Sequence, residues 1–416
     1  MRFSVTLPTG DPRRSADAFA ALEAGGFHGG YTFETSHDPF LPLAQAAAVT
    51  SSLRLGTAVA IGFARNPMVL ANLGYDLQVM SEGRFDLGLG SQIRPHIEKR
   101  FSETWSHPAR RMRELVLAVK AIWEAWETGG PLAFEGEFYR HTLMTPFFDP
   151  GPNPFGPPPV LVGGFGPRMV QVAGEVADGL VVHPFSSRRS MEELTIPALE
   201  AGLRTAGRAR SDIDVLWVTI VVPCSTDDER TERVAAAKAQ LAFYGSTPAY
   251  RPTLDLHGWG DLQPELNRLS KEGRWDRMVE LVPDAWIDEL AVVGRPAEIA
   301  EQLRDRTAGL TDHIGVVAAH GADCAAPRAS STGAAGDTHV DGREEPVGGA
   351  GFVVPFALVA SVEPSECTDP SASWCSEDGT PGDPAPGQEP SGGGGGSPDT
   401  PACGRVTKLH PAGNPQ

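Results

Sequence analysis

The sequence contains few cysteines and no long apolar run. Of its five cysteines only Cys224 precedes residue 320, and none forms a CxxC pair, so a disulfide framework is not expected. No apolar stretch approaches the roughly 18 residues that span a bilayer. The first residues also lack the charged and apolar regions of a secretory signal. These absences predict a reduced, cytoplasmic protein without a membrane segment.

Basic residues are scarce relative to acidic ones. The 416 residues include 35 Lys or Arg against 53 Asp or Glu, which gives a formal net charge of −18. Nucleic acids and anionic membranes bind basic surfaces, so neither is expected as a partner. The predicted partner is a small-molecule substrate.

Several catalytic motifs are also missing. In SEGRFDLGLGSQ (81–92), Gly88 and Gly90 follow an apolar run, but the third glycine of a dinucleotide-binding GxGxxG turn is absent. The chain contains no P-loop, no GxSxG nucleophile elbow and no HExxH zinc motif. His96, His107 and His141 are not spaced as metal ligands, and no metal site is predicted.

The composition changes near residue 320, which predicts two regions. Residues 1–320 alternate apolar and amphipathic stretches, as a folded domain does. Residues 321–416 are rich in Gly, Pro and Ser and carry four Lys or Arg against thirteen Asp or Glu. Such a composition cannot bury enough apolar surface to fold, so a disordered C-terminal tail is expected.

Within the first region, nearly all-apolar strands alternate with helices. Apolar strands of this kind are typical of a parallel sheet that is buried on both faces. Eight such units in about 320 residues favour an α/β fold, the closed (β/α)8 TIM barrel. An insertion over about 243–290 precedes the eighth strand. Its residues Tyr244, Tyr250, His257 and Trp259 are expected to roof the site, and packing against the outside of the barrel is the alternative. The predicted strands are 2–7, 29–35, 53–62, 84–90, 158–164, 178–184, 213–222 and 313–319.

A barrel places its site at the carboxyl ends of its strands. His37 follows the second strand and is the best acid–base candidate, because imidazole titrates near neutrality and Asp38 is placed to tune it. A purely structural role for His37 remains open. The turn from Gly163 to Pro167 opens a helix whose free N–H groups suit an anion, although a simple tight turn is the alternative. His183, after the sixth strand, is expected to face the same cavity.

Six segments together resemble the luciferase-like monooxygenase superfamily, in particular its branch that depends on the deazaflavin coenzyme F420. The similarity covers about residues 1–317. Four of the segments carry the superfamily resemblance in the expected order, and 137–148 and 243–262 are further marks of one subgroup. The segments are GTAVAIGFARNP (56–67), GRFDLGLGSQ (83–92), EFYRHTLMTPFF (137–148), AGEVADGLVVHPF (173–185), FYGSTPAYRPTLDLHGWGDL (243–262) and AVVGRPAEIAEQL (291–303).

The resemblance implies a cofactor at the barrel mouth and assigns residues to it. A non-prolyl cis peptide is expected between Ala58 and Val59, at a bulge that carries the cofactor ring. His37 and Asp38 are implied as the catalytic pair that moves a proton during hydride transfer. The implied cofactor-binding residues are Ala58, Val59, Gly90, Ser91, Gln92, Gly163, Gly164, Phe165, Gly166, Pro167 and His183.

The implied activity is an F420-dependent hydride transfer to or from an unknown small organic substrate. The alternative is a monooxygenase that uses flavin mononucleotide (FMN) with a separate reductase. Family members follow the eighth strand with an amphipathic helix, whereas this chain continues with Ala, Gly and Ser. Because of that departure, a third hypothesis stands beside the two enzymes: a catalytically inactive barrel that binds a cofactor or a partner. A homodimer is a further implication of the resemblance.

Overall fold

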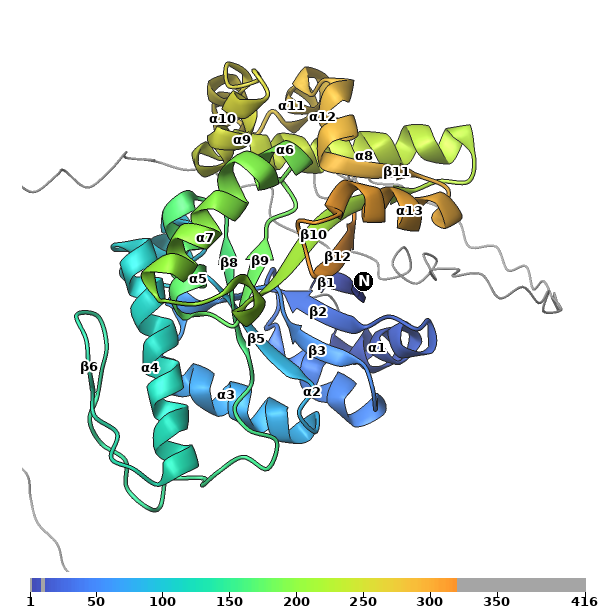
Figure 1. Ribbon diagram of the computed structural model, residues 1–416. Coiled ribbons are helices and arrows are strands. Elements are labelled where there is room, and N and C mark those ends of the chain that lie inside the picture. Colours follow the sequence, from blue (N-terminus) through green and yellow to red (C-terminus); the bar gives the residue numbers. More distant parts are fainter. Residues whose placement is uncertain (1, 9–11, 320–416) are drawn as a thin grey trace, which may run out of the picture. The chain divides into compact units, whose positions relative to one another are not determined.

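Eight parallel strands close into a barrel. The computed structural model describes residues 2–8 and 12–319, and the predicted tail 321–416 lies outside them. The last strand pairs with both the first and the seventh, which closes the ring and confirms the predicted (β/α)8 barrel (Figure 1). In order around the ring, the strands are β1 (Arg2–Pro8), β2 (Gly29–Phe33), β3 (Arg54–Thr57), β5 (Phe85–Gly90), β8 (Val160–Gly164), β9 (Gly179–Val182), β10 (Asp214–Pro223) and β12 (His313–Ala318).

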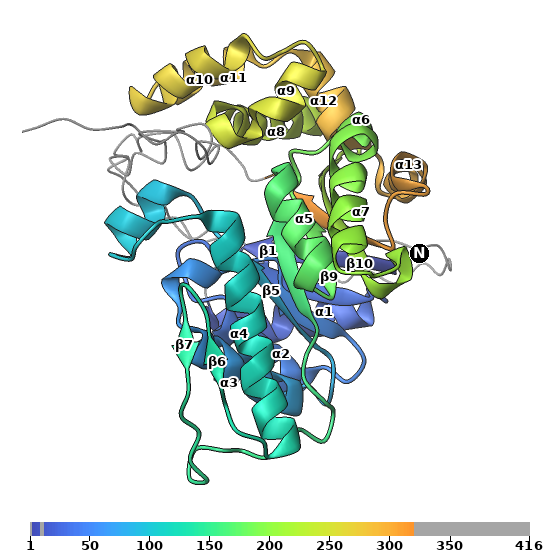
Figure 2. The ribbon, with the colours of Figure 1, turned by 60° about the vertical axis from the view of Figure 1, so that its left-hand side comes forward.

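Helices surround the strands on the outside of the barrel (Figures 1 and 2). Neighbouring helices such as α2 and α3, or α5 and α7, also pack against each other. The outer helices are α1 (Ser15–Ala24), α2 (Phe40–Val49), α3 (Pro67–Met80), α4 (Pro108–Thr128), α5 (Pro167–Val176), α6 (Arg188–Ser190), α7 (Ile196–Thr205) and α13 (Pro296–Thr307). A hairpin of β6 (Phe134–Glu135) and β7 (Arg140–His141) lies beside α4 (Figure 2). Short helical turns are η1 (Pro12–Arg14), η2 (Gly62–Ala64), η3 (His96–Arg100), η4 (Met191–Thr195), η5 (Arg210–Asp212) and η6 (Pro248–Tyr250).

Alternate residues of each strand belong to two different apolar clusters. In β8, Val160 and Val162 pack with the surrounding helices, whereas Leu161 packs with Val181 and Leu216 from neighbouring strands. Both faces of the strands are therefore buried, which explains why their sequences are almost uniformly apolar.

The third predicted strand, 53–62, is interrupted. Pairing stops after Thr57 and resumes in the short strand β4 (Ala60–Ile61), which pairs with the end of β5. Ala58 and Val59 form the break between the two strands. A further parallel strand that the alternation did not predict, β11 (Ala291–Gly294), pairs with the last residues of β10.

A helical segment between β10 and β11 lies at one end of the barrel (Figures 1 and 2). Its apolar cluster is continuous with the barrel interior: Trp286 is fully buried and contacts Phe185. Gly245 leaves room for Trp286, because a Cβ there would lie 2.6 Å from the indole ring. The helices are α8 (Asp227–Ser246), α9 (Arg251–Leu256), α10 (Leu262–Lys271), α11 (Trp275–Leu281) and α12 (Asp284–Leu290), and the last four lie within the predicted insertion.

A buried polar layer lies inside the barrel near the start of the strands. Ser4 Oγ is 2.6 Å from His313 Nε2, and Tyr31 donates to Asp86 Oδ2 at 2.8 Å. Burial lowers the pKa of His313 to about 2. These four side chains hydrogen-bond to one another in pairs, as is usual for buried polar groups.

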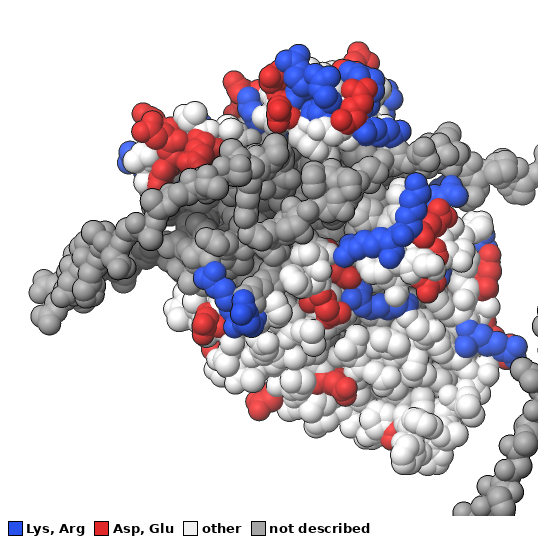
Figure 3. Space-filling view, turned by 180° about the vertical axis from the view of Figure 1, so that it is seen from behind, with Lys and Arg blue, Asp and Glu red and all other residues white. Residues whose placement is uncertain are grey.

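The described surface is unevenly charged. Figure 3 shows a face whose lower half carries few Lys, Arg, Asp or Glu side chains. No helix among the described residues is long and apolar enough to cross a membrane. Large exposed apolar side chains include Leu41 and Val49 on α2, and Val69, Val79 and Met80 on α3.

Candidate functional site

The predicted site residues lie where barrel strands end. His37 and Asp38 follow β2, Ala58 and Val59 follow β3, Ser91 and Gln92 follow β5, Phe165 follows β8, and His183 follows β9. In a parallel barrel these ends share one rim, so segments far apart in the sequence are brought to one mouth.

The bulge between β3 and β4 is held by Glu34. The peptide bond between Ala58 and Val59 is cis, as the resemblance implied. Ala58 N donates to Thr32 O at 2.7 Å, and Glu34 N donates to Val59 O at 3.1 Å. The Glu34 carboxylate also accepts from Ile61 N at 2.8 Å, so it holds the chain beyond the bulge.

Arg65 joins Glu34 to the loop after β2. Its Nη1 lies 2.6 Å from Glu34 Oε2, and its Nη2 lies 3.1 Å from Asp38 Oδ2. The Glu34 and Arg65 side chains are only 5% and 14% exposed, so this charge pair is largely desolvated. Sequence reasoning did not single out Glu34, although its position directly after β2 was the available signal.

His37 and Asp38 have different surroundings. His37 is exposed in the loop between β2 and α2. Asp38 Oδ1 accepts from Phe40 N, at the start of α2, at 2.8 Å, while its Oδ2 pairs with Arg65. The contacts of Asp38 therefore connect it to α2 and Arg65. None of these contacts supports the expectation that Asp38 tunes His37.

The glycines of SEGRFDLGLGSQ make room for the bulge. A Cβ on Gly88 would lie 1.8 Å from Thr57 O, and one on Gly90 would lie 2.5 Å from Val59 Cγ2. On the other side, a Cβ on Gly163 would lie 3.1 Å from Val59 Cγ1. Val59 is thus enclosed by two strands that lack side chains at the points of contact.

Ser91 and Gln92 form a turn that is closed by its own contacts. Gln92 has a positive φ of 59°, and its Oε1 accepts from Ile93 N at 3.0 Å. Ser91 Oγ donates to Gln92 O at 3.1 Å. Both residues are partly buried at the end of β5, and their predicted contact with a cofactor remains a prediction.

An aromatic cluster gathers at the mouth and joins the predicted residues to the helical segment. Phe165 and His183 contact Tyr250 with ring centroids 4.6 and 4.5 Å apart, and Tyr244 lies 4.7 Å from His183. Val59 and Phe165 pack against the same apolar core as the two tyrosines. Two of the four expected roof residues, Tyr244 and Tyr250, therefore belong to the candidate site.

The other two roof residues are engaged with each other and with α6. His257 stacks on Trp259 with centroids 4.5 Å apart, and its Nε2 lies 2.8 Å from Ser187 Oγ. Ser187 is fully buried and caps α6 by accepting from Ser190 N. This Ser–His contact is therefore structural, because a buried hydroxyl of this kind is not accessible to a substrate.

The first turn of α5 leaves space for an anion. Gly166 is its N-cap and supplies no capping side chain, and Met169 N donates instead to Gly166 O at 3.0 Å. A Cβ built on Gly166 meets nothing within 4 Å. Gly164 is packed instead: its Cβ would lie 3.0 Å from Leu180 Cδ1. The open space beside Gly166, at the N-terminal end of the α5 dipole, fits a phosphate group, although Pro167 has no N–H to donate.

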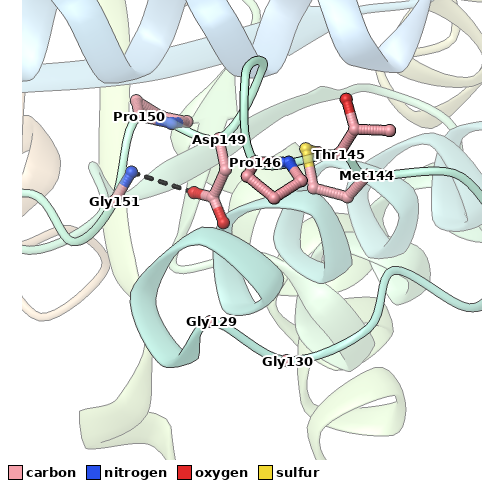
Figure 4. A pocket seen from close by; sticks show the side chains of 8 residues that line it. All are labelled: Gly129, Gly130, Met144, Thr145, Pro146, Asp149, Pro150 and Gly151. Carbon is pink, nitrogen blue, oxygen red and sulfur yellow. Dashed lines mark hydrogen bonds between the residues drawn. The ribbon is translucent and has the colours of Figure 1, made fainter.

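A hollow of about 380 Å³ lies elsewhere, near the start of the strands (Figure 4). Asp149 Oδ1 accepts from Gly151 N at 2.9 Å within it, and its lining includes Gly129 at the end of α4. None of the predicted site residues lines it. No group of three metal-ligating side chains occurs among residues 2–8 and 12–319.

Comparisons with known proteins identify the family of the chain. The profile of the family described as luciferase-like monooxygenase matches residues 1–313. The uncharacterized protein Rv1360 of Mycobacterium tuberculosis is 54% identical over 301 residues, covering 72% of this chain and 88% of that protein. The F420-dependent glucose-6-phosphate dehydrogenase of Nakamurella multipartita is 31% identical over 243 residues, covering 56% of this chain and 70% of that enzyme.

The fold is also shared with a solved structure. The coenzyme F420 dependent tetrahydromethanopterin reductase from Methanopyrus kandleri superposes with a TM-score of 0.63 at 23% identity, covering 76% of this chain and 92% of that one. At this identity the likeness concerns the fold.

Proposed function

Because the chain belongs to the luciferase-like monooxygenase family, we propose that it is an oxidoreductase that uses coenzyme F420 and transfers a hydride to or from a small organic substrate. The observation that carries the proposal is the convergence of the Val59 bulge, Phe165 and the uncapped first turn of α5 on one mouth. F420 dependence of similar proteins supports the choice of cofactor.

The residues at the mouth fit this cofactor. Gly166 and Pro167 would border a phosphate at the α5 N-terminus, where the helix dipole favours an anion, and Ala58, Val59 and Phe165 would support the flat cofactor ring. Bound coenzyme F420 supplies an obligate two-electron hydride carrier. The chain's own contribution is to orient the ring against the bulge and to exclude water by means of the helical segment that ends in α12.

His37 is the proposed proton donor or acceptor. It is exposed in the loop after β2, at the same rim as the bulge, and it is free to meet a bound substrate. We expect His37→Ala to lower turnover by about 10²-fold or more while F420 affinity is retained, as loss of a general acid or base does. Full activity in His37→Ala would remove this role.

Fluorescence titration distinguishes F420 from the alternatives. The purified full chain is titrated separately with oxidised F420 and with FMN, and quenching of each fluorophore is followed. Saturable F420 binding without comparable FMN binding supports the proposal. Tighter FMN binding favours the monooxygenase alternative. Binding of neither cofactor would contradict both enzyme proposals.

The predicted phosphate position at the start of α5 is tested by Gly166→Asp, with Gly166→Ser as its matched control. Asp is a favourable N-cap residue, so α5 is expected to be as stable as before or more stable. Its negative charge, however, lies where the phosphate is expected and should weaken F420 binding by about tenfold or more. Gly166→Ser caps the helix without the charge and should weaken binding much less. Equal affinities in both variants would place the phosphate elsewhere.

A further inference from the structure

We propose that Tyr250 donates a hydrogen bond to an uncharged oxygen of the substrate, a ketone or the corresponding alcohol, and that His183 positions Tyr250 for this. The inference rests on the proposed function, because it places the substrate at the barrel mouth. Tyr250 comes from η6 in the helical segment, so it would contact the substrate from that segment and not from a barrel strand.

The protonation of His183 follows from its partners. Phe185 N donates to His183 Nδ1 at 3.1 Å, so Nδ1 carries no proton. Burial lowers the pKa of His183 to about 3, and the ring is therefore neutral at pH 7. Its single proton must lie on Nε2, which is 3.1 Å from Tyr250 Oη.

The Tyr250 oxygen is consequently an acceptor in this pair. His183 Nε2–H donates to it, and the hydrogen of the Tyr250 hydroxyl is left for another acceptor. Among residues 2–8 and 12–319 the structure records none. Burial also raises the pKa of Tyr250, so the hydroxyl keeps its proton and acts as a donor.

The surroundings of Tyr250 indicate an uncharged acceptor. Its ring neighbours are Phe165, His183, Phe185 and Tyr244. The cation–π contacts recorded among the described residues involve none of these rings. A neutral His and aromatic side chains cannot balance the negative charge of a buried carboxylate or phosphate. A carbonyl or alcohol oxygen is uncharged and needs only one hydrogen-bond donor.

Tyr244 supplies the matched control. It lies in the same cluster, but its Oη is 3.0 Å from Gln240 Nε2 and does not bond to His183. Tyr244→Phe and Tyr250→Phe therefore remove the same atom from neighbouring rings. Only the second removes the hydroxyl that His183 holds.

The test compares binding of acetophenone with that of ethylbenzene, a hydrocarbon of similar shape, by ligand-observed NMR on the full chain. The ratio of the two affinities is expected to fall by about three- to tenfold in Tyr250→Phe, the loss of one hydrogen bond, and to change little in Tyr244→Phe. The proposal is overturned if the wild-type ratio persists in Tyr250→Phe, or if the wild type shows no preference for the ketone.

His183 is tested through its spectrum and through two substitutions. In ¹⁵N-histidine-labelled protein, His183 should remain the neutral Nε2–H form from about pH 8 to pH 5. His183→Gln, whose side-chain amide can donate to Tyr250, should retain more of the ketone preference than His183→Leu. A protonated Nδ1, or equal preference in the two variants, would contradict the positioning role.

These measurements do not require bound coenzyme. If F420 fails to bind but the ketone preference depends on Tyr250, the proposed function fails and the acceptor site remains. If F420 binds and the preference is absent, only the assignment of Tyr250 fails.

Discussion

The side chain of Val59 occupies the space that a side chain on Gly90 would need. A Cβ on Gly90 would lie 2.5 Å from Val59 Cγ2, closer than packed carbon atoms approach. The absence of a side chain at Gly90 is therefore explained by its contact with Val59. Its predicted contact with a cofactor depends on the position that Val59 adopts beside it.

This relationship predicts a coupling between the two positions. Gly90→Ala should lower the free energy of unfolding by about 1–3 kcal/mol, because it overpacks a buried contact. In a Val59→Ala background the added methyl group fits, so the same change should cost about 1–2 kcal/mol less. A double-mutant cycle in urea measures the coupling. Additive effects of the two substitutions would contradict the contact.

Glu34 is predicted to stabilise the mouth through its buried ion pair. Glu34→Gln leaves the largely buried Arg65 with Asp38 as its remaining carboxylate partner, and should lower the free energy of unfolding by about 1–3 kcal/mol. The exposed pair of Glu200 and Arg204 is the control, since Glu200→Gln should have no measurable effect. Equal effects of the two substitutions in urea unfolding would refute the prediction.

Stability should fall in mild acid because buried histidines resist protonation. Burial lowers the pKa of His313 to about 2 and that of His183 to about 3, whereas in the unfolded chain both titrate near 6.5. Their contribution is therefore complete above about pH 6.5 and is lost as the pH falls towards the folded-state values. Each histidine contributes up to about 1.4 kcal/mol per pH unit in that window.

Urea unfolding between about pH 7.5 and pH 5.5 measures this dependence. His313→Asn removes one titrating group, so its free energy of unfolding should depend less steeply on pH than that of the wild type, whatever its absolute stability. An unchanged slope in the variant would show that His313 is protonated in the folded state.

The apolar side chains on α2 and α3 predict association between two copies of the chain. Leu41 and Met80 are 62% and 50% exposed, which is costly for large apolar groups in water. We expect the protein to be a dimer and Leu41→Glu with Met80→Glu to make it monomeric. Phe147→Glu, which changes an exposed apolar side chain in the loop after β7, is the control. Sedimentation equilibrium reports the mass of each form, and a monomeric wild type would contradict this prediction.

The sequence by itself determined the architecture. Uniformly apolar strands that alternate with helices can be buried only between an interior and a helical layer, and the matching segments identify the family. The cis bond between Ala58 and Val59 was also predictable, because it belongs to a local segment that the resemblance covers.

The tertiary structure alone decided which residues meet. Glu34 holds the bulge from the loop after β2, and Val59 fills the gap beside Gly90 and Gly163. Tyr250 contacts His183, which lies 67 residues earlier in the chain. These contacts depend on the closure of the barrel and on the path of the helical segment between β10 and β11. Periodicity cannot specify them, because it reports which face of an element is buried and not which distant atoms share that space.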